Sequence, residues 1–467
     1  MVLLAALASP SRAAFDDDFT GSSMRMDLYH SGHAELELVS LAAVRVEGPW
    51  PGRRHQLLDP TDLGKYRFEV RDAETARVLF SQGYASIYGE WETTGPAADG
   101  IVGTWPECLR FPEPRRPVEV VLSKRGADQA FHEIWRTTVD PASRFVDRSS
   151  VAPHEVRTLV DSGDPATKVD LLVLGDGYTA GEMEKFYSDA GRATGYLFAE
   201  EPFASRRGDF NVRAIGTPAR ESGISRPRSG LFRDSPLGTT YNVFDSERYV
   251  LSTDEFAWRD VAAAAPYDVV LILVNSRKYG GGGIYGLYST AAIDSAFAGY
   301  LVVHEFAHHF AALGDEYYTS SVAYQEDDEE PAEPWEPNLT ALKDPEHLKW
   351  SHLVRSQTPI PTPWHKEEYE AASREIQQRR QELRAAGAPE EELEALFRSE
   401  QELFTEMLGT QEWSGRVGAF EGAGYRAHGL YRPATDCVMF TRDAVGYCPV
   451  CAEAITRIID LHTRSER

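Results

Sequence analysis

The clearest chemical signal in the sequence is a pair of histidines four residues apart, His304 and His308, with Glu305 directly after the first. On an α-helix, residues at i and i+4 share one face and lie about 6 Å apart along the axis. Both imidazoles can then reach one Zn²⁺ ion at about 2.0–2.1 Å. Glu305 is turned away from their shared edge but stays close enough to accept a proton from a zinc-activated water as general base. The spacing therefore predicts a hydrolytic zinc site.

The residues around this motif predict a buried helix. Residues 296–313 are largely apolar outside the motif, they contain no proline, and Asp294 can cap the first turn. Burying two imidazoles and a carboxylate is costly unless they find partners, and a cation would be such a partner. A hydrogen-bonded histidine–glutamate cluster without metal is the alternative.

A catalytic zinc ion needs a third protein ligand and an open fourth position. Asp315 would lie about 16 Å from His304 along an unbroken helix, which is out of reach. Gly314, just before it, can adopt the left-handed conformation that ends a helix and turns the chain back. We expect Asp315 to be the third ligand, with Glu316 as the alternative. The acid that does not bind zinc could accept a hydrogen bond from a histidine N–H.

Other polar side chains lie close to the motif in the sequence. Tyr317, Tyr318 and Tyr425 are candidates for a phenol that stabilises the developing oxyanion, and the sequence does not choose among them. His309 points about 100° away from His308 on a helix, so we expect it to pack rather than bind metal.

A glycine-rich segment over residues 279–285 follows an apolar strand at 268–274. It is not a phosphate-binding loop, because no Lys-Ser/Thr pair follows it. Its glycines would let a substrate backbone approach, and an adjacent edge strand could pair with an extended peptide. A surface loop is the alternative.

Three of the four cysteines, Cys437, Cys448 and Cys451, lie near the C-terminus, whereas Cys108 stands alone. Three thiols fall short of a four-cysteine metal site, and no suitably spaced histidine completes one. For an exported protein, a structural disulfide is the favoured interpretation. A redox pair is the alternative.

Two regions of the chain, which differ in their pattern of polar and apolar residues, must position these groups. Residues 15–151 show several short segments of alternating polarity, at 67–71, 118–122 and 132–139, which predict an all-β, sandwich-like domain. From residue 152 to 467, apolar strands alternate with helical patterns, which predicts an α+β catalytic domain.

Within the second region, residues 366–412 are rich in Glu, Arg, Gln and Leu and predict a charged helical insertion with a break at 387–389. A solvated hairpin is favoured there over a lid. Residues 326–336 are acidic and interrupted by proline, so they predict a surface loop.

Composition and charge exclude several classes of protein. The net charge of −25 would repel a nucleic-acid backbone and an anionic membrane surface. No apolar run is long enough to insert into a membrane. Residues 2–8 are apolar and small residues follow, which suggests a signal-peptide remnant over residues 1–14, with a disordered terminus as the alternative.

The segment 304–318, HEFAHHFAALGDEYY, resembles the signature of the bacterial IgA-peptidase family of zinc metallopeptidases. Further segments are similar to that family, so the resemblance covers nearly the whole chain: 26–30, 174–179, 279–285, 418–425 and 437–440. The resemblance implies a zincin or metzincin-like catalytic domain, with a mixed β-sheet and an active-site helix, as well as secretion and peptide-bond hydrolysis. It also implies that Met439 is the methionine beneath the zinc site. In common metzincins a histidine is the third ligand, whereas here Gly314 and then an acid occupy that part of the motif.

The sequence therefore predicts a secreted or periplasmic zinc endopeptidase that binds Zn²⁺ through His304, His308 and Asp315 and uses Glu305 as general base. Its expected partner is a protein or peptide substrate, with no nucleic acid and no membrane insertion. A non-proteolytic zinc hydrolase acting on cell-wall amides, and a surface-binding protein with a structural zinc ion, are the alternatives.

Overall fold

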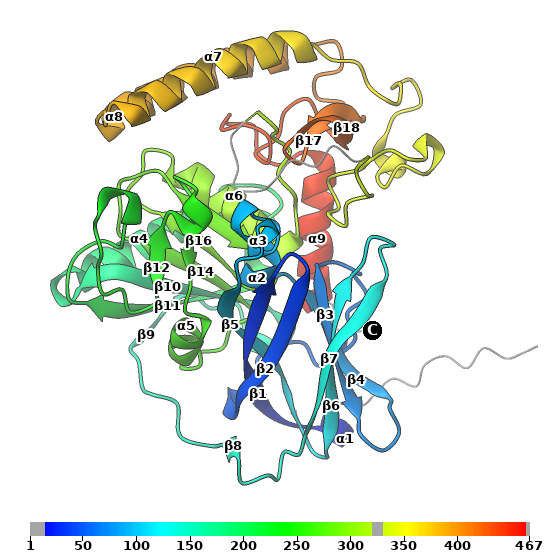
Figure 1. The fold of residues 1–467 in the computed structure, drawn as a ribbon, viewed down its shortest axis with the longest axis vertical. Helices are drawn as coiled ribbons and strands as arrows, with labels where there is room; N and C mark the ends of the chain where they lie inside the picture. The colour runs from blue at the N-terminus through cyan, green and yellow to red at the C-terminus, as the bar shows by residue number, and fades with distance from the viewer. Residues whose placement is uncertain (1–14, 320–329, 464–467) are drawn as a thin grey trace, which may run out of the picture.

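The computed structural model describes residues 15–319 and 330–463. The expected signal-peptide remnant over residues 1–14 lies outside the described residues, as does the first part of the acidic segment 326–336. The described chain is a mixture of helices and several β-sheets, with an N-terminal β region followed by a larger α+β region (Figure 1).

The first region contains two four-stranded sheets (Figure 1). One has the strand order β5-β1-β2-β8, with the bounds β1 (Phe19–His33), β2 (Leu36–Pro49), β5 (Gly103–Pro114) and β8 (Val146–Asp147). The other has the order β4-β3-β6-β7, with the bounds β3 (Tyr66–Asp72), β4 (Val78–Tyr84), β6 (Val118–Arg125) and β7 (Phe131–Val139). Three short helices accompany them: α1 (Phe15–Asp18), α2 (Ile87–Trp91) and α3 (Gly95–Ala98).

The alternation of side chains explains how these sheets pack. In β3, Tyr66, Phe68 and Val70 are buried, whereas Arg67 and Glu69 between them are half-buried, because successive strand residues point to opposite faces. Apolar side chains of both sheets meet in one core, among them Met26, Leu28, Leu109, Phe111, Val120 and Leu122. The polar–apolar alternation in the sequence therefore places the apolar side chains of both sheets in one shared core.

The second region is built on a six-stranded sheet of order β15-β16-β14-β10-β11-β9. The four inner strands pair in parallel, and the two edge strands, β15 and β9, are antiparallel to their neighbours. The bounds are β9 (Val156–Val160), β10 (Val169–Thr179), β11 (Phe210–Ala219), β14 (Val269–Val274), β15 (Gly281–Ile284) and β16 (Tyr288–Ala292). Two small ribbons complete the strands: β12 (Thr239–Tyr241) with β13 (Val250–Ser252), and β17 (Phe420–Ala423) with β18 (Arg426–Arg432).

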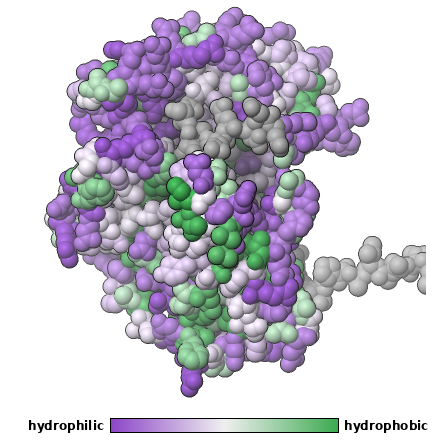
Figure 2. Space-filling view, in the orientation of Figure 1, coloured by the Kyte–Doolittle hydropathy of each residue, from purple (hydrophilic) through white to green (hydrophobic). Residues whose placement is uncertain are grey.

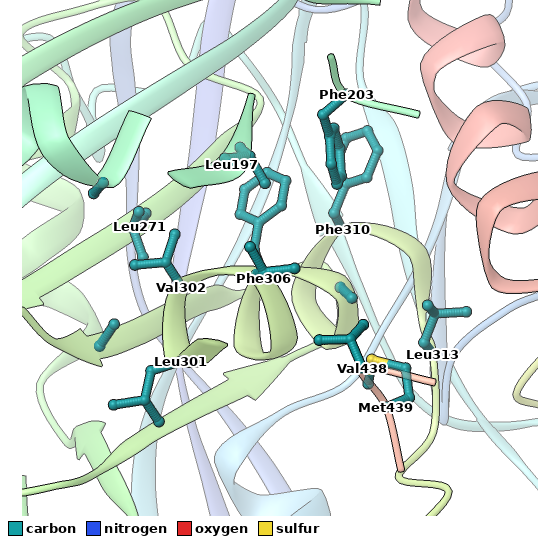
Figure 3. Close-up of a cluster of buried hydrophobic side chains, with 14 of the residues drawn as sticks. Leu197, Phe203, Leu271, Leu301, Val302, Phe306, Phe310, Leu313, Val438 and Met439 are labelled. Atoms are coloured by element: carbon teal, nitrogen blue, oxygen red, sulfur yellow. The ribbon is translucent and has the colours of Figure 1, made fainter. Parts of the chain in front are cut away.

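Helix α6 (Ala298–Ala311) carries the histidine motif and packs on this sheet. Its apolar side chains Leu301, Val302, Phe306 and Phe310 enter the main core beside Leu197 (Figure 3). Its neighbours include α4 (Met183–Leu197) and the C-terminal α9 (Pro449–Thr463), while α5 (Glu255–Ala262) lies elsewhere in the region. The motif is therefore held on a rigid, buried element.

The predicted charged insertion forms a helical hairpin of α7 (Lys366–Ala385) and α8 (Glu390–Gly409) (Figure 1). Its outer surface is hydrophilic (Figure 2). Its inner face is not solvated, because Tyr369, Phe397 and Phe404 join the main core. Arg384 of the hairpin also pairs with Glu247 at 2.6 Å. The hairpin is thus a packed part of the second region.

The two regions share direct contacts. The backbone N–H of Ala85 donates to the carbonyl of Tyr285 at 2.8 Å, and Arg110 donates to the carbonyl of Tyr267 at 2.9 Å. Among the residues that the structure describes, no helix combines the length and the apolar character needed to cross a membrane.

Candidate active site

The N-terminal end of α6 differs from the prediction. The helix begins at Ala298 after Phe297, without a side-chain cap. Asp294 lies outside the helix and pairs instead with Lys185 at 2.8 Å and Arg192 at 3.1 Å. Two nearby cations thus compete for the carboxylate that the sequence pattern assigned to the helix cap.

The C-terminal end of α6 also differs from the prediction. The residue that turns the chain back is Ala312, with a left-handed φ of 58°, and Gly314 is not left-handed. A Cβ atom on Gly314 would lie 2.5 Å from Leu339 Cδ1, so this glycine allows close packing rather than the turn. The reversal still brings Asp315 back to the helix face that carries the motif.

Three side-chain atoms from this turn and helix form a nearly equilateral triangle. His304 Nε2 lies 3.1 Å from His308 Nε2, and Asp315 Oδ1 lies 3.0 Å from the first and 3.2 Å from the second. Ligands about 2.0–2.1 Å from a tetrahedral zinc ion are about 3.3–3.4 Å apart. The triangle therefore has the size of one face of a zinc coordination sphere.

The hydrogen bonds of the two histidines show what this triangle lacks. His304 Nδ1 contacts the carbonyl of Val438 at 2.9 Å, and His308 Nδ1 contacts the carbonyl of Leu313. A carbonyl only accepts, so each Nδ1 must donate, and each Nε2 points into the triangle. Asp315 Oδ1 has no hydrogen-bond donor there. Protons on the rings or one metal ion would complete this set of two Nε2 atoms and a carboxylate oxygen, and the residues fit zinc in ligand type and number.

The second carboxylate oxygen of Asp315, Oδ2, is fixed by a hydrogen bond. The hydroxyl of Tyr425 donates to Asp315 Oδ2. Burial opposes ionisation of Asp315, but His308 and His304 outweigh it and hold the pKa of this carboxyl well below its usual range. Asp315 therefore presents a negative charge to the site, while Glu316, the alternative ligand, turns away from it.

Glu305 lies half-buried beside the two histidines, and its carboxylate is within 4.8 Å of their ligating atoms. Burial is the main cause that raises the pKa of Glu305, and Asp315 adds to it, while His304 and His308 oppose it. A carboxylate with a raised pKa is a stronger base. Glu305 thus lies next to the triangle with its pKa raised above the ordinary value.

The glycine-rich segment packs against this glutamate. Gly281 and Gly283 belong to edge strand β15. A Cβ atom on Gly281 would lie 3.0 Å from Glu305 Cγ, and one on Gly283 would lie 2.2 Å from the backbone oxygen of Glu305. These glycines, which the sequence pattern relates to the approach of a substrate backbone, allow α6 itself to pack closely against β15.

The triangle opens into a cleft of about 630 Å³. One wall comes from the second region and includes β15. The other wall comes from the first region, with Lys65, Ser86 and Arg125 among its residues. The cleft therefore lies between the two β-rich regions.

Of the three candidate tyrosines, Tyr317 and Tyr425 line the cleft. Tyr425 is engaged by Asp315, whereas the hydroxyl of Tyr317 accepts a hydrogen bond from Arg248 at 2.9 Å. Tyr318 instead stacks on Phe440. Arg248 was not predicted, because no sequence pattern connects it to a motif that lies more than fifty residues away.

His309 and Met439 are both buried in the protein interior. Nε2 of His309 accepts the backbone N–H of Val270 at 3.0 Å, and Nδ1 lies 3.2 Å from the carbonyl of Ile284. Burial lowers the pKa of His309 to about 3, so the ring stays neutral. Met439 is fully buried near the end of α6 (Figure 3), and its carbonyl accepts the N–H of Glu316 at 2.9 Å.

The four cysteines are free thiols, so the disulfide expected from the sequence is not present. Cys437, Cys448 and Cys451 do come together, and Glu316 joins them. Glu316 lies far from the cysteines in the chain, so no sequence pattern identifies it as their fourth partner.

Comparison with known families decides the classification. The model of the family described as IgA Peptidase M64 matches residues 157–459, about two thirds of the chain. The chain belongs to this family. A second model, Peptidase M64 N-terminus, matches residues 14–136. The resemblance found in the sequence is therefore confirmed, and the family supports a metallopeptidase acting on a protein or peptide substrate. No curated protein matches the chain at a significant level.

Proposed function

We propose that this M64 family member is a secreted zinc-dependent endopeptidase, with His304, His308 and Asp315 as zinc ligands. One observation carries the proposal: both Nδ1–H groups are donated to carbonyls, so two Nε2 lone pairs and a carboxylate oxygen face one another at 3.0–3.2 Å. A zinc ion bound by all three would satisfy them together. Export rests on the apolar pattern of residues 2–8.

The chain's own residues then have defined roles. A zinc ion bound there would polarise the scissile carbonyl and activate a water molecule for attack. Glu305 accepts the proton of that water and returns it to the leaving amine. Tyr317, with Arg248 behind its hydroxyl, faces the cleft and can donate to the oxygen on which negative charge develops. Tyr425 keeps Asp315 oriented.

The substrate would lie in the cleft as an extended chain. β15 is the edge strand of the six-stranded sheet and lines the cleft through Gly281, Gly283 and Ile284. A peptide that pairs with a sheet edge gains main-chain hydrogen bonds without a sequence requirement. The first region would hold the opposite side of the chain through polar side chains such as Lys65 and Arg125.

Glu305→Gln tests the proposal most directly. The amide keeps the size of the side chain but cannot take the proton, so casein and peptide cleavage should fall by about 10²–10⁴-fold, while the zinc content stays that of the wild type. Glu382→Gln, the same change on the exposed hairpin, should leave the rate unchanged. Cleavage by the wild type should stop with a chelator and return with zinc. Full activity of Glu305→Gln would remove Glu305 from the mechanism, and a zinc-loaded protein that cleaves no peptide would favour a binding protein.

A further inference from the structure

A second group of potential ligands lies apart from the triangle: Glu316, Cys437, Cys448 and Cys451. One ligand atom from each lies within 4.8 Å of the others. We propose that these four side chains bind a structural zinc ion, in addition to the ion proposed for the catalytic site.

The distances within this Cys₃Glu cluster match a tetrahedral site. Cys437 Sγ lies 3.8 Å from Cys451 Sγ, and Cys451 Sγ lies 3.3 Å from Glu316 Oε1. With Zn–S bonds of about 2.3 Å and a Zn–O bond of about 2.0 Å, the corresponding edges are about 3.8 and 3.5 Å. A disulfide would need its sulfurs at about 2.05 Å. The spacing is therefore that of thiolates around an ion.

The cluster is buried and its hydrogen bonds are incomplete. Glu316, Cys437 and Cys451 have no exposed surface, and Cys448 is 6% exposed. Asn338 donates to Glu316 Oε1 at 3.0 Å, but Glu316 Oε2 is buried without any partner. A buried carboxylate without compensation is expensive, and a metal ion compensates it.

Neighbouring groups suit a negatively charged metal complex. The backbone N–H of Cys448 points to Cys437 Sγ at 3.3 Å, as a donor to a thiolate. The guanidinium of Arg432 on β18 is fully buried and donates to the carbonyls of Gly422 and Thr435, so it adds a positive charge to this part of the core. Three thiolates and a carboxylate carry more negative charge than one Zn²⁺ ion neutralises, and Arg432 offsets part of the remainder.

Ligand chemistry selects the ion and its role. Thiolates favour zinc over the hard cations Mg²⁺ and Ca²⁺, which prefer oxygen. Four protein ligands leave no open position for a water or a substrate, which is the pattern of structural rather than catalytic zinc.

The second site would also position the first. Glu316 directly follows Asp315, and Cys437 directly precedes Val438, whose carbonyl holds His304. Cys448 and Cys451 lie at the beginning of α9. One ion would thus fix the turn after α6, the segment before Met439 and the last helix, and so hold two groups of the catalytic triangle in register.

The test counts zinc by native mass spectrometry in the full-length His304→Ala/His308→Ala variant. This variant lacks the catalytic pair, and we expect it to retain one zinc ion per chain. Its X-ray absorption spectrum should show sulfur neighbours at about 2.3 Å. Adding Glu316→Gln, a change of nearly equal volume, should remove the ion or weaken its binding at least tenfold. Adding Cys108→Ser instead should leave one ion, because Cys108 lies in the first region beside Asp27.

Absence of zinc from the double histidine variant would overturn the proposal, as would a disulfide between any two of the three cysteines in the folded wild type. The absorption measurement keeps all four ligands, so it does not depend on how Glu316→Gln folds. Because the count is made without the catalytic pair, sulfur-bound zinc supports the second site even in a chain that cleaves no peptide.

Discussion

The two regions of the molecule each bury a histidine–carboxylate cluster, and the clusters differ in what they can hold. In the first region, His30 Nδ1 lies 2.8 Å from Glu107 and its Nε2 lies 2.9 Å from Glu37. In the second region, His304 and His308 each give one N–H to a backbone carbonyl and turn the other nitrogen toward Asp315.

The partner of the second ring nitrogen makes the difference. At His30, both nitrogens face carboxylates, so both must carry protons. Burial opposes that charge, but Glu107 and Glu37 outweigh it and raise the pKa of His30 to about 9. At His304 and His308, one nitrogen of each ring donates to a carbonyl, and the two remaining nitrogens converge on a single carboxylate oxygen, the arrangement that we propose binds zinc. The same residue types therefore build a proton site in the first region and the proposed metal site in the second.

His308→Ala tests the metal side of this comparison and should have the largest effect. The variant should bind one zinc ion fewer than the wild type, and peptide cleavage should fall by roughly 10³-fold or more, since the ion stabilises transition-state charge by several kcal/mol. Zinc counting and peptide assays measure both changes. His30→Gln provides the matched control and should keep the zinc content. Equal zinc loss in the two variants would abolish the distinction between the clusters.

The pH dependence of stability tests the proton side. Below pH 6.5, His30 is protonated in both folded and unfolded chains, so its stabilisation is complete. Between pH 6.5 and about 9, the unfolded chain loses the proton while the folded chain keeps it. The contribution to the free energy of unfolding should therefore decline by roughly 3 kcal/mol as the pH rises through this window.

Urea unfolding of the first region between pH 6 and 9.5 measures this decline. The His30→Gln variant should show a flatter profile, because the titrating group is gone. A wild-type profile without this decline above pH 6.5 would show that the folded chain does not keep the His30 proton there.

Tyr425→Phe sharpens the comparison with a smaller change. It removes the donor to Asp315 Oδ2 and leaves the aromatic ring. Loss of such a supporting hydrogen bond lowers zinc affinity or activity by about 10–100-fold. Competition with a zinc chelator measures the affinity, and Tyr431→Phe, on the neighbouring β18, serves as control. Unchanged zinc affinity and activity would show that Asp315 needs no support from Tyr425.

The strands and the motif helix could be predicted from the sequence because periodicity reports burial directly. The alternation over 67–71 lies inside β3, and the apolar run at 268–274 contains β14. The spacing of His304 and His308 likewise follows from the geometry of one helical turn.

The failures concern contacts between distant parts of the chain. Asp294 was assigned as a helix cap, but Lys185 and Arg192 hold it. The turn after α6 was attributed to Gly314, whereas Ala312 makes it and Gly314 makes room for Leu339. Sequence patterns encode local preference, and these outcomes depend on tertiary partners that no local pattern contains.

The Cys₃Glu cluster is the clearest case of this limit. The cysteines were recognised, but their fourth partner, Glu316, precedes Cys437 by more than a hundred residues. Only the fold brings the turn after α6 beside the start of α9.

Because the cleft is bounded by both regions, the proposed hydrolytic groups and part of the surface that would contact a substrate lie in different regions of the chain. The groups that would break the peptide bond all lie after residue 300, whereas Lys65, Ser86 and Arg125 lie in the first region, on the opposite wall of the cleft. Substitutions in that opposite wall would change which peptides the cleft binds, without changing the residues that we propose carry out the reaction. Natural selection could thus change the substrate specificity of such an enzyme while the residues of its hydrolytic site stay the same.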